Sequence, residues 1–174
     1  MSVPLISALA LVGAGLIVLG LTARIVPQQH VFVVERLGRY SHSLGAGFHV
    51  LFPLVDVVRH KHSLAEQTLA VPAEACRTRD ERQVWIDGAV VMRITDPRKA
   101  SYDVADYRAA IQQFARTTLR RRIADLDLDR LHADRDAVCA AIAADLRPAA
   151  GAWGVAVLRY EMTDISRHNK ESAA

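Results

Sequence analysis

The sequence predicts an α+β domain, a curved, mainly antiparallel sheet with packed helices, after one N-terminal transmembrane helix. Three observations predict it. Residues 3–23 carry no charge, residues 30–94 contain runs that alternate at the strand period of two, and residues 104–146 repeat apolar side chains at the helical period. A strand pattern at 155–165 closes this order, which is typical of helices packed on an antiparallel sheet.

The uncharged run is long enough to span a bilayer. At about 1.5 Å per residue, a helix over residues 3–23 matches the ~30 Å hydrocarbon core. The alternative is a cleaved secretory signal, but a signal has a basic start, a shorter apolar core and a small-x-small cleavage site, which fit this run poorly. We therefore expect residues 1–26 to be an uncleaved membrane anchor. Its apolar side chains include Leu5, Ile6, Leu9, Leu11, Leu16, Ile17, Leu19 and Leu21.

Positive charge on one side of this segment predicts its orientation. Arg24, Arg36 and Arg39 follow it, and no Lys or Arg precedes it. The positive-inside rule then places the domain, residues 27–165, and a short polar tail, residues 166–174, on the cytoplasmic face. The net charge of +3 and the pI near 9.1 add a mild attraction to anionic headgroups. No basic stripe is interleaved with exposed aromatic residues, so we expect no nucleic-acid partner.

The strands are expected in the first half of the domain. The β-branched and aromatic run at 30–40 predicts the first, which is stopped by Gly38 and a turn region at 41–47. Four more strands are expected, over residues 48–52, 55–62, 67–71 and 84–94. The strand over 67–71 ends at Pro72, and the long strand over 84–94 has one apolar and one polar face.

The period changes at Asp96-Pro97, a pair that favours the start of a helix. Apolar residues at helical spacing predict a helix over 104–123. The Asp125–Asp129 run then breaks the pattern and supplies caps for a second helix over 131–146, which is expected to end before Pro148.

No catalytic centre is predicted. His60 and His62 share a face of one strand and could begin a metal site, but no third ligand lies nearby, so surface histidines are favoured. Asp125, Asp127 and Asp129 are spaced like the start of a calcium loop, but they lack its downstream Gly and Glu and fit helix caps better. We therefore expect no metal, no cofactor, no small-molecule substrate and no enzymatic activity.

A basic run precedes these aspartates. It contains Arg116, Arg120 and Arg121, with the first two one helical turn apart. A solvated face with local ion pairs is one interpretation. The other is a polar seam between identical subunits, in which the basic run of one subunit meets Asp125, Asp127 and Asp129 of its neighbour.

Short blocks along residues 26–165 carry a family resemblance. In order they are Val34-Glu35-Arg36-Leu37-Gly38-Arg39-Tyr40, Gly45-Ala46-Gly47-Phe48-His49, Pro53-Leu54-Val55-Asp56, Thr78-Arg79-Asp80, Val84-Trp85-Ile86-Asp87-Gly88, Arg93-Ile94-Thr95-Asp96-Pro97 and Trp153-Gly154 to Asp164-Ile165. This series resembles the SPFH (band 7) domain of stomatin-type proteins. The resemblance implies membrane-anchored proteins without a known catalytic centre in this domain, which assemble into rings or cages, organise lipid microdomains and regulate membrane proteins such as proteases and channels.

The chain departs from this family after Ile165. Relatives continue into a long helix rich in Ala, Glu and Gln that builds the wall of the assembly, whereas this sequence has a short polar tail. We therefore expect weak self-association. The resemblance also implies partial membrane insertion of an apolar hairpin, with an ordinary core strand as the alternative. Its residues are Phe48, Val50, Leu51 and Phe52.

Together these features predict a non-enzymatic, membrane-anchored scaffold that organises microdomains and modulates membrane proteins. Its expected partners are the lipid bilayer, further copies of the chain and another membrane protein. The alternative is an accessory subunit of a membrane protease complex.

Overall fold

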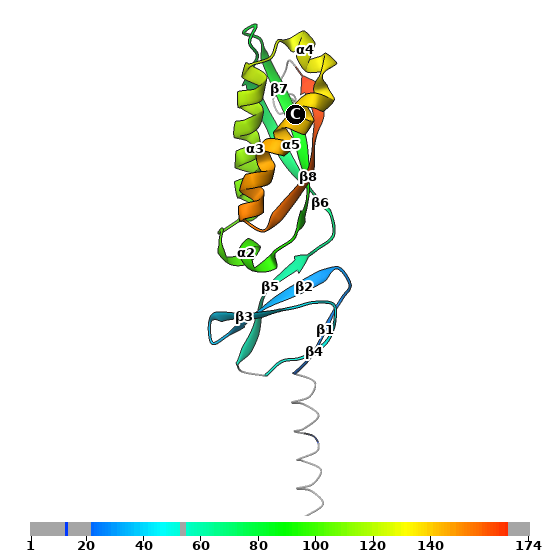
Figure 1. Ribbon diagram of the computed structural model, residues 1–174, viewed down its shortest axis with the longest axis vertical. Helices are drawn as coiled ribbons and strands as arrows, with labels where there is room; N and C mark the ends of the chain where they lie inside the picture. Colours follow the sequence, from blue (N-terminus) through cyan, green and yellow to red (C-terminus); the bar gives the residue numbers. More distant parts are fainter. Residues whose placement is uncertain (1–12, 14–21, 53–54, 167–174) are drawn as a thin grey trace, which may run out of the picture. The chain divides into compact units, whose positions relative to one another are not determined.

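The computed structural model describes residue 13, residues 22–52 and residues 55–166. It divides the chain into two compact units, with unit 1 ending at Leu64 and unit 2 beginning at Ala65. The described residues confirm the mixture of antiparallel strands and helices, but they form three separate sheets where we expected one (Figure 1).

Unit 1 is built from five short strands. A two-stranded ribbon pairs β1 (Ala23–Val26) with β4 (Gly47–Val50), and a three-stranded sheet places β2 (His30–Arg36) between β3 (Arg39–Leu44) and β5 (Asp56–Ser63). Its small core is formed by Val26, Val34, Leu44 and Leu51, with Phe32 and Val58 packed against it.

The single strand expected over 30–40 is a hairpin instead. The chain reverses at Leu37 and Gly38, which both have positive φ angles, 52° and 78°. Glycine adopts that conformation without strain. The first part of the turn region expected at 41–47 therefore belongs to strand β3, which ends at Leu44.

Strand β1 lies where the anchor was expected to extend. Residues 23–26 pair with β4, and Val26 is a core residue, so these four residues belong to the folded unit. The anchor side chains from Leu5 to Leu21 lie outside the described residues, as do residues 167–174 of the expected tail. In the part of the chain that the structure describes, no helix has the length and apolar character needed to cross a membrane.

Unit 2 packs helices on a three-stranded antiparallel sheet. The strands β6 (Gln67–Arg77), β7 (Gln83–Ile94) and β8 (Val155–Ser166) lie in that order, so β7 is central. The two long helices, α3 (Tyr107–Ala124) and α5 (Arg135–Ala152), contact each other, and each contacts one edge strand (Figure 1). The core includes Ile86, Ile111, Leu119, Ile142 and Leu146.

Side-chain caps fix where the first two helices of unit 2 begin, whereas Asp127 precedes a later helix without making a side-chain cap hydrogen bond, so the cap predicted there is wrong. Asp96 accepts hydrogen bonds from the backbone N–H groups of Arg98 and Lys99, which confirms the predicted start of α2 (Pro97–Tyr102). Asp106 caps α3 in the same way, so that helix starts at Tyr107 and not at residue 104.

Both prolines that were expected to end elements lie inside them. Strand β6 continues past Pro72 to Arg77 through a β-bulge between Val71 and Glu74. A bulge leaves a residue unpaired, and proline, which has no N–H to donate, is tolerated there.

The helix expected over 131–146 is two helices. The short α4 (Leu128–Ala133) ends at Asp134, and α5 then runs through Pro148 to Ala152. Leu146 and Ala150 on either side of the proline are both buried, so packing against the sheet maintains the helix across it.

Candidate interaction surfaces

The β1–β4 ribbon has one apolar face that is open to solvent. Ile25 is directly opposite Phe48, and Ala23 is opposite Val50, so these side chains share a face. Ile25 is 77% exposed, Phe48 65% and Val50 63%. Phe52, at the same parity, is also exposed, whereas Leu51 is buried in the core. The predicted hairpin therefore separates into three outward residues and one core residue. We call Ile25, Phe48, Val50 and Phe52 the ribbon patch.

An ion pair holds the end of this hairpin. The Arg36 guanidinium donates to both carboxylate oxygens of Asp56, at 2.8 and 3.1 Å, and lies 5.9 Å from the centre of the Phe52 ring. The backbone N–H of Phe52 donates to the same carboxylate at 3.1 Å. The hydrogen bonds from Arg36 lower the pKa of Asp56, so the carboxylate stays ionised and the segment after β4 stays fixed at neutral pH.

In unit 2, two arginines of the predicted seam bind a carboxylate of their own chain. Arg116 and Arg120 both pair with Glu74, which is only 5% exposed. Burial alone would raise the pKa of Glu74, but the hydrogen bonds from Arg120 and Arg116 outweigh it and lower the pKa. The bulge after Pro72 makes this possible, because the extra residue turns Glu74 to the face that carries Leu69 and Val71.

The next two arginines of α3 share a second carboxylate. Arg121 and Arg122 pair with Asp145 of α5 at 3.0 and 2.8 Å, which lowers the pKa of Asp145 through the hydrogen bond from Arg122. The structure therefore brings none of the four arginines to the aspartates at 125–129 of the same chain. Asp125 and Asp129 are exposed.

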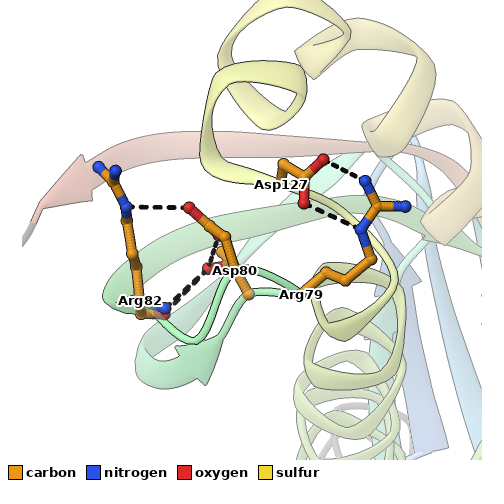
Figure 2. A network of polar contacts seen from close by, with 5 residues as sticks. Arg79, Asp80, Arg82 and Asp127 are labelled. Carbon is orange, nitrogen blue, oxygen red and sulfur yellow. Dashed lines mark hydrogen bonds and ion pairs between the residues drawn. The ribbon is translucent and has the colours of Figure 1, made fainter.

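Asp127 belongs to a different polar network (Figure 2). The Arg79 guanidinium lies against the Asp127 carboxylate, just before α4, and its Nε–Oδ1 distance is 2.9 Å. Asp80 lies beside Arg82 at 2.9 Å and accepts a hydrogen bond from the Thr78 hydroxyl, which lowers the pKa of Asp80. These contacts fix the β6–β7 turn to the connection between α3 and α4.

The remaining candidate groups are separate. Within the described ranges, no three His, Cys, Asp or Glu side chains are grouped to bind a metal ion. His60 and His62 stack with their ring centres 6.1 Å apart. Both cysteines are free, and burial raises the pKa of Cys76 to about 11 and also raises that of Cys139, so both thiols stay protonated at neutral pH.

Sequence reasoning missed the carboxylates that partner the basic run. Glu74 follows Pro72, where the strand was expected to have ended, and Asp145 lies on an otherwise apolar stretch of α5. The one available signal was the presence of each acid in an apolar segment, since a buried carboxylate needs a cationic partner.

Comparison with known proteins identifies the family. Residues 24–170 match the SPFH domain / Band 7 family. The chain is 41% identical over 140 residues to human "Stomatin-like protein 2, mitochondrial", and 34% identical over 145 residues to the Caenorhabditis elegans stomatin-like protein stl-1. An uncharacterised protein of Mycobacterium tuberculosis is 32% identical over 150 residues.

These matches cover most of this chain but less than half of each relative. The human match spans 80% of the chain and 39% of the relative, and the nematode match spans 83% and 45%. The chain belongs to the SPFH/Band 7 family and is similar to its stomatin-like members.

Proposed function

We propose that this protein is a non-enzymatic, membrane-anchored scaffold that organises lipids and modulates other membrane proteins. The observation that carries the proposal is the ribbon patch, an exposed apolar surface formed by β4, the segment after it and β1, the strand at the end of the uncharged run at residues 3–23. Exposed apolar patches mark sites of protein or membrane contact. Family membership supports the stomatin-like role.

Membrane contact through this patch has a physical basis. Complete burial of one large apolar side chain is favourable by about 1.5–3 kcal/mol, and partial burial in the interface by a fraction of that. Arg24, on β1, is exposed and can approach anionic headgroups. The proposed orientation, with the domain on the cytoplasmic face, rests on the arginines that follow the run.

Depth-dependent quenching tests the contact. The full chain carrying Phe48→Trp is reconstituted in vesicles that contain brominated lipids, and its fluorescence is compared with that of the unsubstituted chain. We expect the added tryptophan to be quenched strongly. Tyr102→Trp is the matched control, because Tyr102 is also an exposed aromatic residue but lies in unit 2. Equal quenching of the two added tryptophans would contradict the proposal.

An accessory subunit of a membrane protease complex is the alternative. Purification in a mild detergent distinguishes the two roles, because a stoichiometric protease partner favours the accessory subunit, and co-purified lipid with self-association favours the scaffold.

Self-association is proposed to be weak. The basic run already binds Glu74 and Asp145 within its own chain, and exposed ion pairs add only about 0–1 kcal/mol each. Anchoring to one bilayer raises the effective concentration of the copies. We therefore expect clusters on vesicles that disperse in high salt.

A further inference from the structure

Strand β8 is an edge of the unit 2 sheet, and part of its backbone faces away from β7. Tyr160 pairs with Val90 and Met162 with Gly88, at the same parity of an antiparallel ladder. Met162 directs both polar groups away from that ladder, because its C=O accepts from Arg135 and its N–H faces the Cys139 sulfur of α5. Alternate residues of an edge strand point the same way, so the N–H and C=O of Tyr160 also emerge at this edge.

Two arginines of α5 cover the ends of this edge. Arg135 binds the Met162 carbonyl, and Arg147 donates to the carbonyls of Val157 and Leu158 at 3.4 Å each. These acceptors are neutral, and bonds of 3.4 Å are longer than the usual 2.9–3.0 Å. A guanidinium binds a carboxylate more strongly than it binds a peptide carbonyl. Each arginine would therefore form a stronger hydrogen bond if a carboxylate replaced its present carbonyl partner.

Between the two arginines lies a hollow of about 540 Å³. Small side chains of α5, including Cys139, Ala140 and Ala143, line it on one side, and residues 158–162 of β8 line it on the other. Arg135 and Arg147 are separated by about 18 Å along the helix. An extended peptide covers that distance in about five residues.

We propose that the β8 edge between Arg147 and Arg135 binds an extended segment of a partner protein. The segment carries a carboxylate near each end and joins the sheet as an additional strand. Its backbone pairs with Tyr160, and its two carboxylates bind the two arginines. Charge favours this partner, because Arg159 and Glu161 pair with each other at 2.5 Å, which leaves the two arginines Arg135 and Arg147 against the single carboxylate of Asp136 in the lining of the hollow. Addition of a strand to an exposed sheet edge is a common mode of peptide recognition.

This site is separate from the ribbon patch, since all its residues belong to unit 2. A failure of one proposal therefore leaves the other in place.

Fluorescence polarisation with a defined probe tests the site. The probe is a labelled peptide of alternating valine and threonine with a glutamate near each end, and the full chain in detergent is titrated against it. We expect saturable binding, weakened about tenfold or more when glutamine replaces both glutamates or when either Arg135→Gln or Arg147→Gln is made. Ala140→Phe, at an exposed position that lines the hollow, should abolish binding without any change in charge.

Arg130→Gln is the matched control, because it removes one exposed arginine outside the hollow. Binding should be unchanged in this variant. If Arg135→Gln fails to fold, Ala140→Phe and the pair of peptides still decide the question. Equal affinity for the two peptides, equal weakening by Arg130→Gln, or no binding of either peptide would overturn the proposal. A dimer of the full chain that Ala140→Phe converts to a monomer would overturn it too, since the edge would then bind a second copy.

Discussion

Glu74 makes the stability of unit 2 depend on pH, because its buried carboxylate lies between Arg116 and Arg120 of α3. Its pKa is lowered in the folded state from the ordinary 4.5. A depressed pKa contributes stability above the unfolded value, and this stability is lost as the pH falls from about 4.5 through the folded pKa. We expect Glu74→Gln to lower the free energy of unfolding by about 1–2 kcal/mol at pH 7, with a smaller difference from the unsubstituted chain at pH 3.5.

Urea denaturation at the two pH values measures this effect. Glu81→Gln is the control, because Glu81 is exposed and its oxygen lies 3.6 Å from Arg77, so its effect should be within about 0.5 kcal/mol at both pH values. A Glu74→Gln deficit of the same size at pH 7 and pH 3.5 would show that shape, and not charge, accounts for the loss.

Gly154 is a second residue that the fold requires, at the turn from α5 into β8. Its φ is +71°, and a Cβ atom there would lie 2.4 Å from the Asp96 carbonyl oxygen. The Gly154 carbonyl accepts hydrogen bonds from the backbone N–H groups of Thr95 and Asp96. These bonds hold the α5–β8 turn against the segment that follows β7, so the two cannot move apart to make room for a Cβ atom. We expect Gly154→Ala to lower the free energy of unfolding by about 2–3 kcal/mol.

The same substitution at Gly151 should have the opposite sign. Gly151 is helical, and apart from its chain neighbours and the backbone of its own helix a Cβ atom there meets nothing within 4 Å. Gly151→Ala should therefore stabilise the chain by about 0.5–1 kcal/mol. Parallel thermal melts of the two variants check both values, and destabilisation by Gly151→Ala would contradict the argument.

At the scale of elements, Pro148 is the clearest case of packing overriding local preference. It lies inside α5, where proline cannot donate to the carbonyl of residue 144 and crowds it. We expect Pro148→Ala to raise the free energy of unfolding by about 1 kcal/mol, since the restored hydrogen bond outweighs the added freedom of the unfolded chain.

Pro97→Ala is the matched comparison. Pro97 is the first residue of α2, where its fixed φ favours the helix, so its loss should destabilise by about 0.5 kcal/mol. Denaturant midpoints of the two variants should move in opposite directions. A lowered midpoint for Pro148→Ala would mean that the proline ring itself is needed for packing.

The prolines also show how far local pattern could predict these elements. Period and caps correctly predicted β7, α2 and the two strands β4 and β5, because their boundaries depend on nearby residues. Local rules treat proline as a stop, so the pattern predicts that elements end at Pro72 and before Pro148. Whether a bulge or a packed helix accommodates it depends on partners distant in the sequence, and these are not visible in a local window.

For the candidate surfaces too, the sequence predicts the features that depend on nearby residues and not those that depend on distant partners. The sequence predicts an apolar hairpin at 48–52. It does not predict which of its side chains point outward, because the strand that pairs with it, β1, falls within the range expected for the anchor. The arginines of α3 were readable as a basic run, whereas Glu74 reaches them only through the bulge.

For the whole molecule, the boundary between the proposed anchor and the folded chain decides which residues can be removed without loss of structure. Val26 is 3% exposed in the core of unit 1, and β1 is the partner of β4 in the ribbon. A chain that begins at residue 27 therefore loses a core residue and leaves β4 without its partner. A chain that begins at residue 22 keeps both, together with the hydrogen bond from the Leu51 N–H to the Thr22 carbonyl at 2.8 Å.

We therefore expect the two truncations to differ in unit 1 and to agree in unit 2. Hydrogen exchange of the 22–174 chain should show protected amides in both β2 and β7. In the 27–174 chain, protection of β2 and β5 should fall by about tenfold or more, since the loss of one core valine and a strand pairing weakens unit 1 by at least about 1.4 kcal/mol. Protection of β7 should be unchanged, because its core cluster contains no residue of unit 1. Equal protection of β2 in the two chains would mean that β1 adds nothing to unit 1. A loss of protection in β7 would mean that unit 2 cannot fold when unit 1 is damaged.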